Sequence, residues 1–320
     1  MRIIDMHCDT ICSITTSETP KELYDYEGQI SIKKLQKGGS LAQFFAIFIP
    51  THRGETEPIP EAAYKFYKKA LNVYKTEMEK NKEFILPAYN YDDIMRNKSE
   101  NKMSGILTIE DGVPLNGDIN RLIEAYNDGV RLVSFTWNYE NSLGYPNSRD
   151  VDKMNLGLKP FGIEVIDKMN ELGMIIDVSH LSDGGFYDVA KYSKKPFVAS
   201  HSCCRNLCGH PRNLTDDMLK ILGNKGGVVG INFCASFLND NADYTDIDSV
   251  VRHMLYIKDK AGIDALGFGS DFDGIGSKLE FVDYTGMPLI INALEKHFTD
   301  DEIDKICNGN MLRVIKETLK

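Results

Sequence analysis

The sequence predicts an α/β protein, and more specifically a single (β/α)8 barrel of the TIM type over residues 1–320. Three observations lead to this prediction: the chain length, a regular succession of apolar runs and helical stretches, and polar residues placed directly after the apolar runs. With 320 residues, 42% of them hydrophobic, the chain can bury one large core or two ordinary ones. Length alone does not decide between these, so the order of the elements must.

Short apolar runs rich in β-branched residues are the candidate strands, and stretches with helical spacing lie between most of them. Glycines at 129, 173 and 262 follow three of the helical stretches, as expected at helix C-termini. This alternation favours a closed barrel over an open doubly wound sheet, which is the alternative. The candidate strands are Ile3–Met6, Phe44–Ile49, Ile106–Ile109, Val130–Phe135, Met174–Val178, Pro196–Ala199, Val228–Phe233 and Ala265–Phe268, and the helical stretches are Ala62–Tyr74, Ile119–Asn127, Phe161–Leu172, Asp216–Leu222 and Ser249–Lys260.

The chain shows no linker composition, low-complexity tract or repeat that would divide it. The segment 287–320, with helical stretches at Asp301–Cys307 and Met311–Leu319, is expected to form C-terminal helices packed on the outside of the barrel. We therefore expect one domain rather than two.

Charge and composition exclude several classes of partner. The 37 basic and 47 acidic residues give a net charge of −10, which argues against nucleic acid or an anionic membrane surface as a partner. The sequence has no apolar core of a secretion signal and no apolar stretch long enough for a spanning helix, so a cytoplasmic location is expected. The seven scattered cysteines are expected to be reduced, and the cluster Cys203-Cys204-x3-Cys208 lacks the second pair that a zinc finger needs.

Polar side chains of chemical interest follow the candidate strands, at the point where each apolar run ends. In a barrel of parallel strands these ends meet on one face, where active sites of the fold lie. A site on this face would collect His7-Cys8-Asp9, Glu110-Asp111-Gly112, Thr136-Trp137-Asn138, Ser179-His180, Ser200-His201, Asn232 and Asp271-Phe272-Asp273.

His7 and Asp9 have the spacing of two metal ligands on one strand. Because side chains alternate along a strand, residues two apart point the same way. Imidazole and carboxylate suit Zn²⁺, and also Mn²⁺, Fe²⁺ or Co²⁺. Glu110, His180 and His201 stand in corresponding positions after other strands.

An alternative is that these five are ordinary structural residues, with the histidines bonded to backbone and the glutamate paired with an arginine. Five such groups at an apolar barrel mouth would carry a large desolvation cost unless a cation compensated it. We therefore predict a metal site formed by His7, Asp9, Glu110, His180 and His201.

Six motifs, in order along nearly the whole chain, resemble those of the membrane (renal) dipeptidase family, the M19 metallopeptidases of the amidohydrolase-like barrels. They are Ile4-Asp5-Met6-His7-Cys8-Asp9, Ile109-Glu110-Asp111-Gly112, Ile176-Asp177-Val178-Ser179-His180, Ser200-His201-Ser202, Pro211-Arg212-Asn213-Leu214 and Gly267-Phe268-Gly269-Ser270-Asp271-Phe272-Asp273-Gly274.

The resemblance implies a site with two Zn²⁺ ions, although other divalent metals could replace zinc. His7 and Asp9 would bind one ion, His180 and His201 would bind the other, and Glu110 would bridge them. Two cations about 3.5–4 Å apart can hold a bridging hydroxide at neutral pH, which attacks the amide carbonyl. The implied activity is that of a metallo-dipeptidase.

Two further residues receive roles from the resemblance. Asp271 stands where the family has a carboxylate that takes a proton from the attacking water and gives it to the leaving amine, so Asp271 and Glu110 are the candidate catalytic residues. Arg212 matches an arginine thought to hold the terminal carboxylate of the substrate. The alternatives are a turn residue at 271, a role that Asp273 could equally fill, and a surface arginine at 212.

One position departs from the family pattern. Active members commonly carry Thr-His after the fourth strand, and this histidine binds substrate and stabilises the oxyanion, whereas this chain has Thr136-Trp137. An indole N–H can donate one hydrogen bond, and Asn138 or Asn141 could donate through an amide, so Trp137, Asn138 and Asn141 are candidate substrate-binding residues. Loss of one oxyanion donor costs about 10²–10³ in rate in other hydrolases, so weaker or redirected activity is expected.

The predicted function is a dinuclear zinc dipeptidase, and the resemblance implies tolerance of a D-residue at the C-terminal position. One alternative is a metal-dependent hydrolase of another amide or ester, with the pocket reshaped by Trp137. Another is a metal-binding scaffold without catalysis, which the intact ligands and Asp271 argue against. The family also implies a homodimer, but the mammalian signal sequence and lipid-anchored tail are not expected here.

Overall fold

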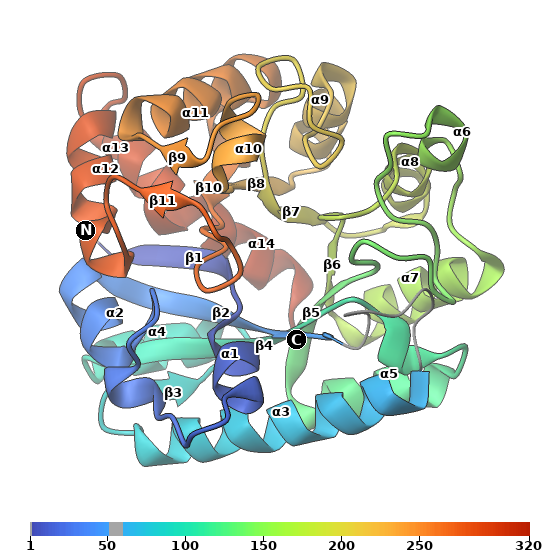
Figure 1. The fold of residues 1–320 in the computed structure, drawn as a ribbon, viewed down its shortest axis with the longest axis horizontal. Helices are drawn as coiled ribbons and strands as arrows, with labels where there is room; N and C mark the ends of the chain where they lie inside the picture. Colours follow the sequence, from blue (N-terminus) through green and yellow to red (C-terminus); the bar gives the residue numbers. More distant parts are fainter. Residues whose placement is uncertain (1, 51–59) are drawn as a thin grey trace.

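The structure is a computed structural model that describes residues 2–50 and 60–320, so the other residues of the predicted domain lie outside it. Its centre is a closed barrel of eight parallel strands, as the sequence predicted (Figure 1). Pairing of the second strand in the chain with the strand that ends at Glu110 closes the ring. The barrel strands are β1 (Ile3–Cys8), β2 (Ser40–Phe48), β4 (Met103–Glu110), β5 (Val130–Ser134), β6 (Ile175–Asp177), β7 (Val198–Ser202), β8 (Val228–Ile231) and β10 (Leu266–Phe268).

Helices surround the barrel, and five of them match the predicted helical stretches. These five are α3 (Pro60–Lys80), α5 (Ile119–Asp128), α7 (Pro160–Leu172), α9 (Asp216–Asn224) and α11 (Ile247–Ala261). Gly129 and Gly173 end α5 and α7 with φ values of 109° and 76°, a left-handed conformation that glycine adopts without strain. Gly262 likewise caps the end of α11, with φ of 86°. The C-cap prediction is therefore confirmed at all three positions.

Other helices were not predicted, because most are short or carry little helical periodicity. They are α1 (Thr10–Thr16), α2 (Ile32–Gly38), α4 (Tyr91–Ser99), α6 (Val151–Met154), α8 (Asp183–Tyr192) and α10 (Ala235–Leu238), with single 3₁₀ turns at Leu23–Asp25, Val113–Leu115, Ile263–Ala265 and Tyr284–Gly286. Three short strands were also missed, since two or three residues are too few for an alternating pattern. Of these, β3 (Ile85–Pro87) pairs with the start of β4, and β9 (Tyr244–Thr245) pairs with β11 (Lys278–Leu279).

The side chains along each barrel strand alternate between two apolar layers. One layer, which includes Met6 and Phe44, fills the barrel. The side chains of the other layer face the surrounding helices. The C-terminal segment forms α12 (Met287–Leu294), α13 (Asp300–Asp304), a π-helical turn (Lys305–Gly309) and α14 (Asn310–Thr318). In α14, Val314 and Ile315 pack against the apolar layer inside the barrel. The sequence indicated only that the C-terminal helices pack on the outside of the barrel.

None of the helices in the described residues has the length and apolar composition needed to cross a membrane. All seven cysteines are free. The thiols of Cys203, Cys204 and Cys208 donate hydrogen bonds to three different backbone carbonyls. These contacts give the cysteine cluster a structural role in the loop after β7.

Candidate metal centre

The five predicted ligands lie together at the C-terminal end of the barrel. Glu110 is central: its Oε2 is 3.3 Å from His7 Nε2, and its Oε1 is 3.0 Å from His180 Nε2 and 3.6 Å from His201 Nε2. Asp9 Oδ2 lies 3.6 Å from His7 Nε2, and all five side chains are buried. Two groups of possible ligands therefore share Glu110, one with His7 and Asp9 and the other with His180 and His201.

The strands β1 and β7 each contain an irregularity at the ligand that they carry. Residues 5–8 of β1 advance three positions against two in β2, and residues 199–202 of β7 do the same against β8. Met6 and Val198 belong to the layer inside the barrel. If side chains alternated strictly from these two residues, His7 and His201 would point outward. The extra residue in each strand reverses the direction, a use of β-bulges that is common beside active sites.

Two glycines make room for the irregularity in β7. A Cβ atom on Gly230 would lie 2.0 Å from the carbonyl oxygen of Ser200, and one on Gly269 would lie 1.7 Å from it. Both positions need glycine because a backbone atom occupies the space of the side chain. Gly230 in the neighbouring strand β8 and Gly269 just after β10 therefore leave room for β7 to present His201.

His180 and His201 each have a fixed tautomer. The Nδ1 atom of His180 lies 3.0 Å from the amide oxygen of Asn138, which can only accept, so Nδ1 carries the proton. The Nδ1 atom of His201 lies 2.7 Å from Ser200 Oγ, whose own proton goes to the Asp177 carboxylate at 2.6 Å. Both Nε2 atoms are therefore unprotonated, although they lie 3.1 Å apart. Two facing lone pairs beside a carboxylate fit a bound cation.

His7 and Asp9 give a second indication of a cation. Neither ring nitrogen of His7 makes a well-aligned hydrogen bond with a described residue, and the same holds for Asp9 Oδ1, although all three atoms are buried. A buried polar atom without a partner generally costs about 1–3 kcal/mol, and metal coordination would remove that cost at one nitrogen of His7 and at Asp9. Their imidazole and carboxylate groups fit divalent cations, Zn²⁺ among them.

Burial changes the protonation of the charged groups. Burial and the neighbouring Asp9 raise the pKa of Glu110 to about 8. Burial alone would lower the pKa of His7, but the carboxylates of Glu110 and Asp9 outweigh it and raise this pKa. A cation bound between these groups would stabilise the carboxylates as anions and His7 as a neutral ligand.

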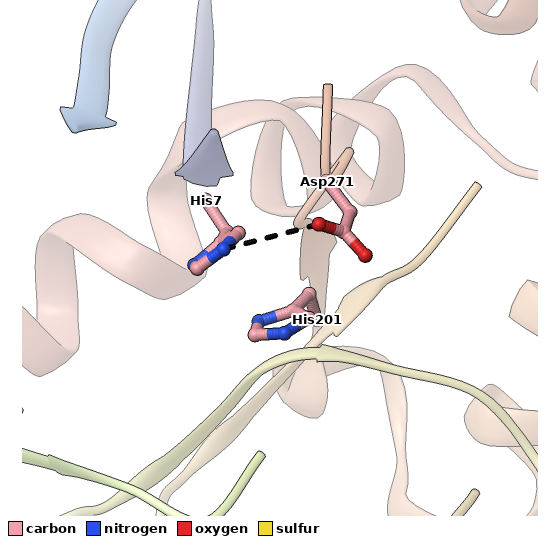
Figure 2. A group of neighbouring side chains, drawn as sticks. All are labelled: His7, His201 and Asp271. Carbon is pink, nitrogen blue, oxygen red and sulfur yellow. Dashed lines mark ion pairs between the residues drawn. The ribbon is translucent and has the colours of Figure 1, made fainter. Parts of the chain in front are cut away.

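Asp271 follows β10, and its side chain lies beside two of the predicted ligands, His7 and His201 (Figure 2). Its Oδ1 is 3.9 Å from His7 Nε2, and its Oδ2 accepts a hydrogen bond of 2.9 Å from Asn232. Asp271 has a left-handed backbone with φ of 62°, as Asp273 does with 66°, a conformation that aspartate adopts more readily than most residues. Asp273, which could equally fill the turn role, accepts hydrogen bonds from the backbone N–H groups of Gln29 and Ile30, just before α2.

A cavity of about 330 Å³ opens at the ligands, within the range of small-molecule sites. Among the predicted substrate-binding residues, Trp137 and Asn138 line it. The indole ring packs edge-on against Phe48, with 4.8 Å between ring centroids. The wall above the centre is therefore aromatic and apolar where the sequence departs from the family.

Asn141, the third predicted substrate-binding residue, supports a loop. Its amide nitrogen donates to the Asp111 carboxylate and the Phe135 carbonyl, and its oxygen accepts from the backbone of Leu143. It is not one of the described residues that line the cavity. These contacts use the amide fully and argue against the expected contact with substrate.

The loop after β5 holds His180 from two sides. Thr136 Oγ1 and the backbone N–H of Asn147 donate to the His180 carbonyl at 3.2 and 2.7 Å, while Asn138 binds the ring. These contacts stabilise a left-handed backbone at His180, with φ of 68°. Because Trp137 is in the same loop, one segment supports both a ligand and the cavity wall.

Arg212 is buried, so it is not the surface arginine that was the alternative. Its guanidinium donates to the carbonyl of His201 at 3.1 Å and to the hydroxyl of Ser202 at 3.5 Å, and its Nε has no described partner. Arg212 is absent from the described lining of the cavity. It lies directly behind His201.

Asp177 and the side chain of Ser200 were not among the predicted site residues, but in the structure Ser200 Oγ contacts both His201 and the Asp177 carboxylate. A signal for the first was present. An aspartate precedes two of the ligand histidines at a short distance, Asp5 before His7 and Asp177 before His180. Aspartates so close to candidate metal-binding histidines are typical of residues that orient metal ligands.

Comparison with known sequences gives one family over the full chain. Residues 1–320 match the family described as membrane dipeptidase, peptidase family M19. A Klebsiella pneumoniae protein, described as an uncharacterized protein in the pqqA 5′ region, is 37% identical over 234 residues, which cover 70% of this chain and 85% of the relative. Dipeptidase tcpJ of Claviceps purpurea is 27% identical over 299 residues, 92% of this chain and 70% of the relative.

Solved structures have the same fold. The crystal structure of a metallo peptidase of family M19, dipeptidase AC, aligns with a TM-score of 0.92 at 25% identity and covers 100% of this chain and 99% of its own. A Rhodobacter sphaeroides metallo peptidase, crystallised with a phosphinate mimic of the dipeptide L-Ala-D-Ala, aligns with a TM-score of 0.90 at 24% identity over 99% of both chains. At this identity the second likeness supports the fold.

Proposed function

The chain belongs to the membrane dipeptidase family, peptidase family M19, and is a metal-dependent dipeptidase. From this premise we propose that it works with two zinc ions. His7 and Asp9 would hold one ion, His180 and His201 would hold the other, and Glu110 would be shared. The observation that carries this proposal is the pair of Nε2 atoms of His180 and His201, which face each other 3.1 Å apart beside a carboxylate while both Nδ1 atoms meet hydrogen-bond acceptors.

The residues around the ligands can supply the remaining chemistry. Two divalent cations, when bound, would make a hydroxide available at neutral pH and polarise the scissile carbonyl. Asp271 would accept the proton of the attacking water at its carboxylate and then deliver it to the leaving amine nitrogen. Asn232 keeps that carboxylate oriented through its hydrogen bond to Oδ2.

The substrate proposed for this site is a dipeptide with a free C-terminal carboxylate. Arg212 is the candidate partner for that carboxylate, because the observed contacts use only part of its five N–H donors and Nε is free of described partners. Tolerance of a D-residue at the C-terminal position is part of the proposal and rests on the family resemblance. The aromatic wall at Trp137 favours a second candidate, hydrolysis of another amide or ester at the same metals.

Metal counting combined with a substrate panel tests the proposal. We expect the purified protein to contain two zinc ions per chain and to hydrolyse L-L or L-D dipeptides such as L-Ala-D-Ala. A chelator should abolish this activity, and added zinc should restore it. A metal-replete protein that hydrolysed amide or ester analogues but no dipeptide would support the second candidate instead.

The Trp137→His substitution tests whether the missing imidazole limits the rate. Residue 137 lines the cavity, so histidine there could donate a hydrogen bond to the developing oxyanion. We expect kcat for dipeptides to rise, by up to about 10²–10³-fold if the full value of one oxyanion donor is gained. Steady-state kinetics with the Trp137→Phe variant is the control, because phenylalanine keeps an aromatic wall without a donor. Equal kcat values in Trp137→His and Trp137→Phe would count against this role.

A further inference from the structure

A buried hydrogen-bond chain runs beneath the metal centre and ends at His201. Asp177, at the end of β6, is fully buried. Its Oδ2 accepts from Ser200 Oγ at 2.6 Å and also from Ser134 Oγ, while its Oδ1 accepts from the backbone N–H groups of Ser179 at 3.0 Å and Ser200 at 2.8 Å. Four donors use the four lone-pair directions of a carboxylate, so this group has a fixed orientation and acts only as an acceptor in these contacts.

The orientation of Asp177 determines the direction of the next bond in the chain. Since the carboxylate only accepts, the Ser200 hydroxyl must donate to it, and the Ser200 oxygen is then left to accept from His201 Nδ1 at 2.7 Å. That places the imidazole proton on Nδ1 and a lone pair on Nε2, which lies 3.6 Å from Glu110 Oε1. The other tautomer would put a proton where a metal must bind.

We propose that Asp177 is a positioning residue of the metal centre, acting through the Ser200 hydroxyl to hold His201 in the tautomer and ring orientation that bind zinc. This proposal rests on the metal centre of the proposed function. Partners of this kind behind a metal-binding histidine also increase the basicity of the ligand. His180 differs, because its Nδ1 meets the neutral amide of Asn138 rather than a chain that ends in a carboxylate.

The two serines that donate to the same oxygen of Asp177 form a matched pair for a test. Both are buried, and removal of either takes one hydrogen bond from the carboxylate. Only Ser200 lies between Asp177 and His201. Ser200→Ala should therefore weaken zinc binding, whereas Ser134→Ala should leave it close to that of the wild type.

The readout is the affinity of the full-length protein for Zn²⁺ alone, measured by competition with a chelator of known affinity. For Ser200→Ala we expect the Kd of one zinc ion, the one that His201 would bind, to rise by about 10–100-fold, the range seen when such partners of metal ligands are removed. Ser200→Cys nearly keeps the volume of the side chain but supplies a poor donor and acceptor, so it should also weaken zinc binding. It replaces Ser200→Ala in the test if the alanine variant fails to fold. Ser200→Thr retains the hydroxyl and should restore the affinity. Thermal unfolding of the metal-free variants reports any general loss of structure.

Equal weakening by Ser134→Ala and Ser200→Ala would overturn the proposal, because it would indicate a general packing effect. Wild-type affinity in Ser200→Ala would overturn it as well. The zinc measurement is independent of hydrolysis, so a wild-type protein that bound zinc but cleaved no dipeptide would contradict the proposed substrate, while the serine comparison would still decide the present proposal. A wild-type protein that bound no zinc would contradict both.

Discussion

Glu110→Gln should remove the carboxylate that the two proposed metal positions share, and with it the hydrolysis of dipeptides. The two carboxylate oxygens lie within 3.0–3.6 Å of His7, His180 and His201. Glutamine has nearly the same shape, but it offers one oxygen, no charge and an N–H₂ group that would face an imidazole lone pair. We expect a larger loss of activity than the roughly 10–100-fold that follows removal of a supporting residue. Kinetics at saturating zinc and the zinc content after dialysis measure both effects.

Glu77→Gln is the matched control for this substitution. Glu77 is also buried, but it binds the backbone of Leu23 and the side chain of Lys80, away from the metal centre. The same chemical change there should lower thermal stability and leave zinc content and kcat unchanged. If Glu110→Gln retained two zinc ions per chain and the wild-type rate, the bridging role of Glu110 would be wrong.

The barrel could be predicted from the sequence because its signal is repeated. Each strand is a short buried run, and errors of a few residues at strand ends, as at Ser40 and Met103, do not change the order of elements. The ligands followed from the same order, since residues after parallel strands meet on one face. His7, Glu110 and His201 could therefore be grouped without knowledge of any distance.

Other features of the centre depend on contacts between distant segments, which a single sequence does not specify. The irregularities in β1 and β7 arise from pairing with neighbouring strands, and strict alternation would have turned His7 and His201 outward. The left-handed conformation of His180 depends on the loop after β5, which donates to its carbonyl. Hydrogen bonds also distinguish Asn138 from Asn141, which have the same residue type and lie in the same loop. Asn138 contacts the His180 ring, whereas Asn141 donates to the Asp111 carboxylate.

Asp271→Asn is the second substitution with a large expected effect, and it should separate proton transfer from metal binding. The carboxylate lies beside His7 and is held by Asn232, but it is outside the two groups that share Glu110. Asparagine nearly preserves the shape of the side chain but cannot accept and release a proton at neutral pH. We expect kcat to fall by about 10²–10⁴-fold, the usual contribution of a general acid–base residue, with little change in KM.

Zinc content decides between two explanations of such a loss. Asp271 also forms a possible ligand group with His7 and His201, so a variant that lost one zinc ion would show that Asp271 binds metal and would contradict the assigned role. Retention of two ions with the lowered kcat is the expected result. Asn232→Ala should reduce kcat less, because the carboxylate remains but loses its hydrogen bond. In the double variant the Asn232→Ala change should add little to the effect of Asp271→Asn, since a residue that acts through another has no separate effect once its partner is gone.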